Sequence, residues 1–115
     1  MAIVLAVEIK TLTLEFPVYA RNELGRQMRL SAESIPANIA EGYGRQRYLA
    51  DFKRFLVNAM GSCTELGCQL EMASKHGYMS QELYRSLDEK CDHLGRSLHV
   101  MIEKWSNDIS RTSNS

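Results

Sequence analysis

Basic and aromatic side chains gather between residues 29 and 54 of the sequence. The set consists of Arg29, Tyr43, Arg45, Arg47, Tyr48, Lys53 and Arg54. Arginine and lysine contact phosphate groups, and tyrosine rings stack on nucleic-acid bases. Together these residue types indicate a nucleic-acid contact. The alternative is a solvated rim in which each exposed ion pair contributes ~0 to 1 kcal/mol to stability.

The charge balance restricts any such contact to a local surface. The 115 residues carry 14 basic and 14 acidic side chains, which gives a formal net charge of zero and no overall positive field. Residues 21–54 hold seven basic and four acidic residues, a net charge of +3 that leaves −3 for the rest of the chain. We therefore expect a basic patch on a neutral molecule, repeated in every subunit of any assembly.

A second group of polar residues surrounds an internal proline in the stretch SIPANIAEG, residues 34–42. The group comprises Ser34, Asn38, Glu41, Ser62 and Glu65. Its members are three or four residues apart on a predicted helix, or lie beside the apolar seam of the next one. Two interpretations stay open. The group either contacts a ligand or RNA, or it forms a structural polar network around the carbonyl groups that Pro36 frees.

Residue types that serve in catalysis or metal binding do not converge in the sequence. The histidines and cysteines are scattered at His76, His93, His99, Cys63, Cys68 and Cys91. A closed zinc site needs four ligands, and cysteines in apolar seams are usually inert. Gly42 and Gly44 follow a predicted helix rather than a strand, so they lack the context of a nucleotide-binding loop. We predict no enzymatic activity, no metal site and no cofactor.

Apolar periodicity predicts the helices that must position these residues. Between residues 49 and 73 the apolar positions step by 3, 4, 3, 4, 3, 4 and 3, which is a heptad seam. Gly77 is the expected residue after the end of this helix. A second stripe covers residues 83–105 and follows Ser80, a plausible N-cap. It predicts a helix that ends near Trp105.

The first half of the chain predicts two more helices. One begins at Pro17, ends at Gly42, and continues with a kink through Pro36. Residues 3–16 alternate like a strand and also step like a helix. A lone strand would leave its backbone groups unpaired against three helices, so we predict a helix here too.

These elements predict a single domain, residues 1–105, with an all-α, antiparallel up-down-up-down four-helix bundle. Residues 106–115 hold one apolar residue in ten and are predicted to form a disordered polar tail. Several apolar residues are left over from the seams: Phe55, Met60, Met72, Tyr78, Met79, Tyr84 and Met101. They indicate either subunit contacts or a loosely filled core.

Cysteine usage and the N-terminal residues bear on the compartment. Three cysteines without a CxxC pair are typical of a reducing cytoplasm. The apolar run at the start of the sequence stops at Glu8, which is too short for a signal peptide or a membrane span. We expect a cytoplasmic protein without membrane contact.

A resemblance to a known family rests on four motifs. They are SIPANIAEG at 34–42, Gly44-Arg45, FKRFL at 52–56, and Gly61-Ser62 with Glu65-Leu66. Together they resemble the four-helix-bundle family of 23S rRNA-intervening sequence proteins, over roughly residues 14–105. The chain is more distantly similar to the accessory bundle proteins of diversity-generating retroelements. In the family a Ser or Thr caps the third helix, where this chain has Gln46 and Arg47.

The resemblance implies a bacterial, cytoplasmic bundle that assembles into a ring, a pentamer, with a link to nucleic acid and no established enzymatic activity. Two functions are compatible with the sequence. The first is a homo-oligomeric, non-enzymatic bundle that binds RNA or another nucleic acid through its basic patch. The second is a scaffold or assembly adaptor that binds a partner protein without nucleic-acid contact.

Overall fold

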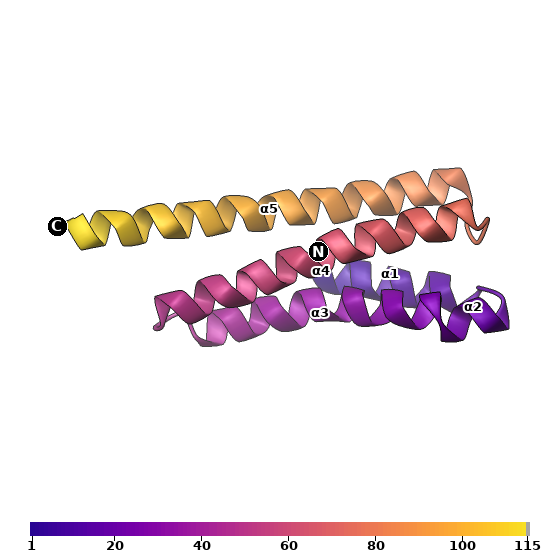
Figure 1. Ribbon diagram of the computed structural model, residues 1–115, viewed down its shortest axis with the longest axis horizontal. Coiled ribbons are helices and arrows are strands. Elements are labelled where there is room, and N and C mark those ends of the chain that lie inside the picture. Colours follow the sequence, from indigo (N-terminus) through magenta and orange to yellow (C-terminus); the bar gives the residue numbers. More distant parts are fainter. Residues whose placement is uncertain (115) are drawn as a thin grey trace.

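The computed structural model describes residues 1–114, with side chains for residues 1–106. The helices are α1 (Ala2–Leu14), α2 (Val18–Asn22), α3 (Leu24–Gly44), α4 (Leu49–Lys75) and α5 (Gln81–Asn114). The four long helices pack against one another, and no strand occurs in the described chain. The predicted all-α four-helix bundle is thereby confirmed. The chain reverses its direction at each connection between long helices (Figure 1).

The two predicted apolar seams form the core. On α4 the seam is buried from Phe52 to Ala73, and on α5 the stripe is buried from Leu87 to Ile102. The outermost members, Leu49 and Leu83, stay 40 and 39% exposed. Burial of such a continuous stripe, rather than intrinsic helix propensity, supplies most of the stability of these helices.

The N-terminal segment forms a helix, as predicted, and it is apolar on almost every side. Leu5, Ile9 and Leu12 are buried, and α1 packs mainly against α3. An ion pair between Glu8 Oε2 and Lys90 Nζ, 2.9 Å apart, also connects α1 to α5. The opposite side of α1 is not covered in the single chain. A helix that is apolar all round is normally buried all round.

The segment from Pro17 to Gly42 differs from the single helix that we expected. Pro17 precedes the short helix α2, the chain breaks at Glu23, and α3 begins at Leu24. Arg29 supports this break, since its guanidinium donates to the Arg21 carbonyl at 3.2 Å and so satisfies the end of α2. Helix α3 continues through Pro36 and ends at Gly44, two residues beyond the predicted stop. A kink at Pro36 stays a prediction.

The connections on either side of α4 differ in how well they are capped. Tyr48 precedes α4, and no side-chain hydrogen bond caps this end of the helix. At the other end, Gly77 has a φ of +80°, and the Tyr78 N–H donates to the Ala73 carbonyl at 3.0 Å. This is a Schellman motif, which confirms the role predicted for Gly77. Ser80 Oγ then accepts the Leu83 N–H at 3.1 Å, as the predicted N-cap of α5.

The predicted end of the last helix near Trp105 is wrong, because α5 continues to Asn114. Residues 106–114 contain neither proline nor glycine, so no residue there forces the helix to stop. We also predicted a polar tail over residues 106–115. The side chains of residues 107–115 lie outside the described part of the structure. None of the helices described combines the length and the apolar run needed to cross a bilayer.

We expect opposite effects from two glycine substitutions. Gly77→Ala should lower the free energy of unfolding by ~1 to 2 kcal/mol, because the new Cβ disfavours a left-handed backbone. Gly61→Ala, in the interior of α4 with open space around it, should raise it by about 1 kcal/mol. Urea unfolding at one protein concentration measures both values, and a stabilising Gly77→Ala would contradict the assigned turn.

Candidate functional site

One end of the bundle carries most of the predicted basic residues, at the turn between α3 and α4 (Figure 1). We call this surface the turn patch, and it consists of Tyr43, Arg45, Arg47, Tyr48, Lys53 and Arg54. All six residues are exposed. The end of α3 presents Tyr43, residues 45–48 form the turn, and the first turns of α4 present Lys53 and Arg54. The fold thus brings together six of the seven residues that the sequence proposed.

Two arginines of the turn patch are held in place by acidic and aromatic neighbours. Arg45 pairs with Glu41 at 3.4 Å and with Asp51 at 3.7 Å, and Arg54 pairs with Asp51 at 3.6 Å. Both guanidinium groups also lie over the Phe55 ring, 5.4 and 4.6 Å from its centroid. These contacts orient the arginines, while the exposed ion pairs themselves add little stability.

The other two cations of the turn patch, Arg47 and Lys53, have no ion-pair partner among the side chains described. Four cations against Glu41 and Asp51 leave the surface with a net charge of +2. Tyr43 forms a T-shaped aromatic pair with buried Phe52, with the ring centroids 5.5 Å apart, and stays half exposed. The turn patch therefore offers free cations next to an anchored aromatic ring.

Arg29 does not belong to the turn patch, which corrects its place in the predicted set. It lies on α3, 16 residues before Arg45 at the end of that helix, which is roughly 24 Å along the helix axis. Its guanidinium is partly buried and donates to Thr13 Oγ1 at 3.0 Å as well as to the Arg21 carbonyl. Arg29 therefore joins α1, α2 and α3.

Three of the five predicted network residues meet between α3 and α4. Ser34 Oγ and Ser62 Oγ share a hydrogen bond of 2.7 Å. Asn38 Nδ2 donates to the Ser34 carbonyl at 2.8 Å and to Ser34 Oγ at 3.0 Å. The other two residues have separate partners, since Glu41 pairs with Arg45 and Glu65 accepts a hydrogen bond from Gln69. This arrangement supports the structural interpretation, because the polar groups satisfy one another inside the bundle.

Gln69 is a buried polar residue that the sequence analysis missed. Only 4% of it is exposed, and it donates from Nε2 to Glu65 Oε1 at 3.4 Å. Gln69 follows Leu66 by three residues, so it lies on the same side of α4 as the apolar seam. This spacing could have indicated from the sequence that Gln69 is buried.

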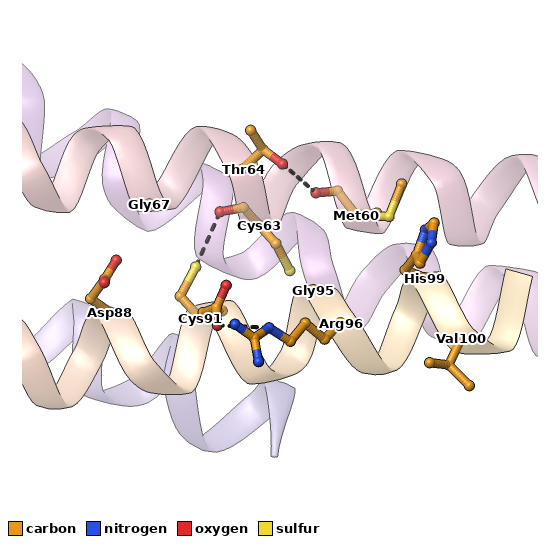
Figure 2. Close-up of a pocket in the computed structure, with 11 residues that line it drawn as sticks. Met60, Cys63, Thr64, Gly67, Asp88, Cys91, Gly95, Arg96, His99 and Val100 are labelled. Atoms are coloured by element: carbon orange, nitrogen blue, oxygen red, sulfur yellow. Dashed lines mark hydrogen bonds and ion pairs between the residues drawn. The ribbon is translucent and has the colours of Figure 1, made fainter.

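A groove of about 620 Å³ lies between α4 and α5 (Figure 2). It is lined by Met60, Cys63, Thr64, Gly67, Asp88, Cys91, Asp92, Gly95, Arg96, His99 and Val100. We call it the α4–α5 groove. Most of its surface is apolar. Figure 2 shows that the ribbons of the other helices lie behind α4 and α5, away from these residues.

The two cysteines of the α4–α5 groove are packing residues. Cys91 Sγ donates to the Cys63 carbonyl at 3.1 Å. Hydrogen bonding with Cys63 and burial raise the pKa of Cys91, so its thiol stays protonated. Hydrogen bonding from Cys91 lowers the pKa of Cys63, and burial opposes that shift. Among the side chains that the structure describes, residues 1–106, no three His, Cys, Asp or Glu groups are placed to hold a metal ion.

Comparisons with known proteins agree with this architecture. The family model described as 23S rRNA-intervening sequence protein matches residues 1–100. The chain belongs to this family. It is also similar to a solved structure from Bacteroides thetaiotaomicron VPI-5482, a protein with unknown function from the S23 ribosomal protein family. The two share 27% sequence identity over 88% of this chain and 94% of that chain, with a TM-score of 0.77. No curated protein matches.

The contact between α3 and α4 predicts coupling between two serines of this family member. Ser34→Ala and Ser62→Ala should each lower the free energy of unfolding by about 1 kcal/mol. The double variant should lose less than the sum, with a coupling of ~0.5 to 1.5 kcal/mol, because one hydrogen bond is counted twice. Urea unfolding of the four proteins measures the cycle. As a control, Ser86 is exposed on α5, so the losses in unfolding free energy of Ser34→Ala and Ser86→Ala should be additive. Additive losses for Ser34→Ala and Ser62→Ala would contradict the contact.

Proposed function

We propose that this protein is a homo-oligomeric, non-enzymatic bundle that binds RNA or another nucleic acid through the turn patch. The observation that carries the proposal is the clustering of four exposed cations and two tyrosines at one end of the α3–α4 helix pair. Phosphate groups are the natural partners of these cations, and exposed rings accept stacked bases. The family name refers to ribosomal RNA, so RNA is the first ligand to test.

The geometry of the turn patch suits an extended polyanion. Arg47 and Lys53 need not break an ion pair with a described side chain before they contact a phosphate. Arg45 and Arg54 can exchange Asp51 for a phosphate at small cost, because their ion pairs are solvated. Phe55 keeps both guanidinium groups near the surface of α4 during such an exchange.

Self-association is supported by the uncovered side of α1. Ile3, Val4, Val7 and Leu14 are 67, 59, 58 and 49% exposed. A contiguous apolar surface of this kind is typical of a protein interface. In an assembly the charge of the turn patch is repeated in every subunit, which strengthens attraction for a polyanion. A pentamer, as the sequence resemblance implied, is the state to test, and the three free cysteines favour a reducing cytoplasm.

Removal of the two unpaired cations should weaken RNA binding. For the variant with both Arg47→Ala and Lys53→Ala, we expect the affinity for single-stranded RNA to fall about tenfold or more at 50 mM salt. The slope of log affinity against log salt should become shallower by ~1 to 2, because fewer counterions are released. Fluorescence anisotropy between about 50 and 200 mM salt measures both quantities.

A matched control carries Lys75→Ala and Arg85→Ala, which remove the same charge from exposed positions outside the turn patch. Its affinity should stay near that of the unmodified protein. Asp51→Asn should instead increase the affinity several-fold, since it frees Arg45 and Arg54. Equal affinities for the control and the Arg47/Lys53 variant would exclude the turn patch as the RNA site.

A protein-binding scaffold is the second candidate function, and the exposed apolar side of α1 favours it. A partner captured from lysate after nuclease treatment, and lost in a Val7→Glu variant, would support this candidate. Capture that depends on intact RNA would support the turn patch.

A further inference from the structure

We infer that the subunits assemble head to tail, with the outer side of α1 of one subunit seated in the α4–α5 groove of the next. This inference rests on the proposed homo-oligomer and names the two surfaces that form it. We call the outer side of α1 the α1 ridge, and it consists of Ile3, Val7, Lys10 and Leu14.

The α1 ridge has the residue spacing of a helix stripe that packs between two other helices. Its residues are spaced by 4, 3 and 4, so they form one stripe along the exposed side of α1. Three of the four are apolar and about half to two-thirds exposed. Lys10 provides the single charge within the stripe.

The α4–α5 groove matches the α1 ridge in length. From Ile3 to Leu14 the ridge extends ~17 Å, and from Asp88 to Val100 the groove extends ~18 Å, at 1.5 Å per helical residue. Gly67 and Gly95 line the groove without side chains, which lets another helix approach closely. Met60 and the exposed Val100 supply apolar contacts.

Charge also favours the α4–α5 groove over a second α1 ridge as the partner of α1. Asp88 lies on the groove and has no ion-pair partner within the described side chains, whereas Asp92 is paired with Arg96 at 3.0 Å. A carboxylate at this position complements Lys10. Two ridges that face each other would instead bring two lysine ammonium groups to the same apolar seam.

The positions of the two surfaces determine the type of assembly. The α4–α5 groove opens away from the ribbons of the remaining helices, as Figure 2 shows, while the ridge is the side of α1 that α3 and α5 leave uncovered. One subunit can therefore use both surfaces at once, with different neighbours. Such a heterologous contact generates a ring when its rotation closes.

Complementation between two variants tests this contact. Val7→Glu disables the α1 ridge, and Gly67→Arg fills the α4–α5 groove while improving helix propensity. Each variant alone should be monomeric by sedimentation velocity at tens of micromolar. An equimolar mixture should form a 1:1 dimer, because the intact ridge of one variant fits the intact groove of the other.

Matched controls are Val57→Glu and Gly61→Arg, which place the same new side chains on exposed α4 positions outside the groove. Both should assemble like the unmodified protein. Far-UV circular dichroism verifies that each variant keeps its helix content. If Val7→Glu does not fold, Lys10→Glu replaces it in the experiment. This variant should raise the Kd of assembly about tenfold or more. Asp88→Lys in the same chain should reverse this rise, because the two charges are then exchanged.

The outcomes separate this inference from the proposed function. The ridge-in-groove contact would be overturned if Gly67→Arg assembled like the unmodified protein and the mixture formed no dimer. The proposed homo-oligomer would then still stand. A monomeric unmodified protein would overturn both. Neither outcome affects the RNA titration, which tests the turn patch separately.

Discussion

Burial of the long apolar seam of α4 is the interaction on which the rest of the structure depends. Helix α4 packs against α3 on one side and α5 on the other, whereas α1 reaches the bundle mainly through α3. The seam continues from Phe52 to Ala73, so the neighbouring helices are aligned along most of its length. The turn patch extends from the N-terminal end of α4, and the α4–α5 groove lies along its middle. Both candidate surfaces are therefore positioned by the same buried stripe.

Much of this arrangement could be predicted because it depends on local patterns. The 3-and-4 spacing of apolar residues identified α4 and α5, and single-residue signals at Gly77 and Ser80 located the turn between them. Most of the turn patch was also predictable, since residues 43–48 are adjacent in sequence and Lys53 and Arg54 follow within two helical turns. Ser34, which accepts a hydrogen bond from Asn38, meets Ser62 because the motif faces α4 across a four-residue turn.

Features that depend on contacts through space were missed or misplaced. Arg29 was grouped with the other cations by sequence proximity, but its partners, Thr13 and Arg21, are set by the meeting of α1 and α2. The break at Glu23 was missed as well, although Gly25 follows it closely, because the contact of the Arg29 guanidinium with the end of α2 forms only through space. The α4–α5 groove is lined by Gly67 and Gly95, which are 28 residues apart in sequence and come to one surface only when α4 packs on α5.

The order of the helices in space also affects how the chain folds. Helix α3 packs on α4 and α4 packs on α5, each on the next helix in sequence, so these contacts close short loops and lose little chain entropy. Chains dominated by such local contacts fold in roughly microseconds to milliseconds. The ion pair between Glu8 and Lys90 is the exception, because it joins residues 82 positions apart. Docking of α1 onto α5 therefore carries the largest loop-closure entropy, and we expect it to follow the assembly of the α3–α4–α5 unit.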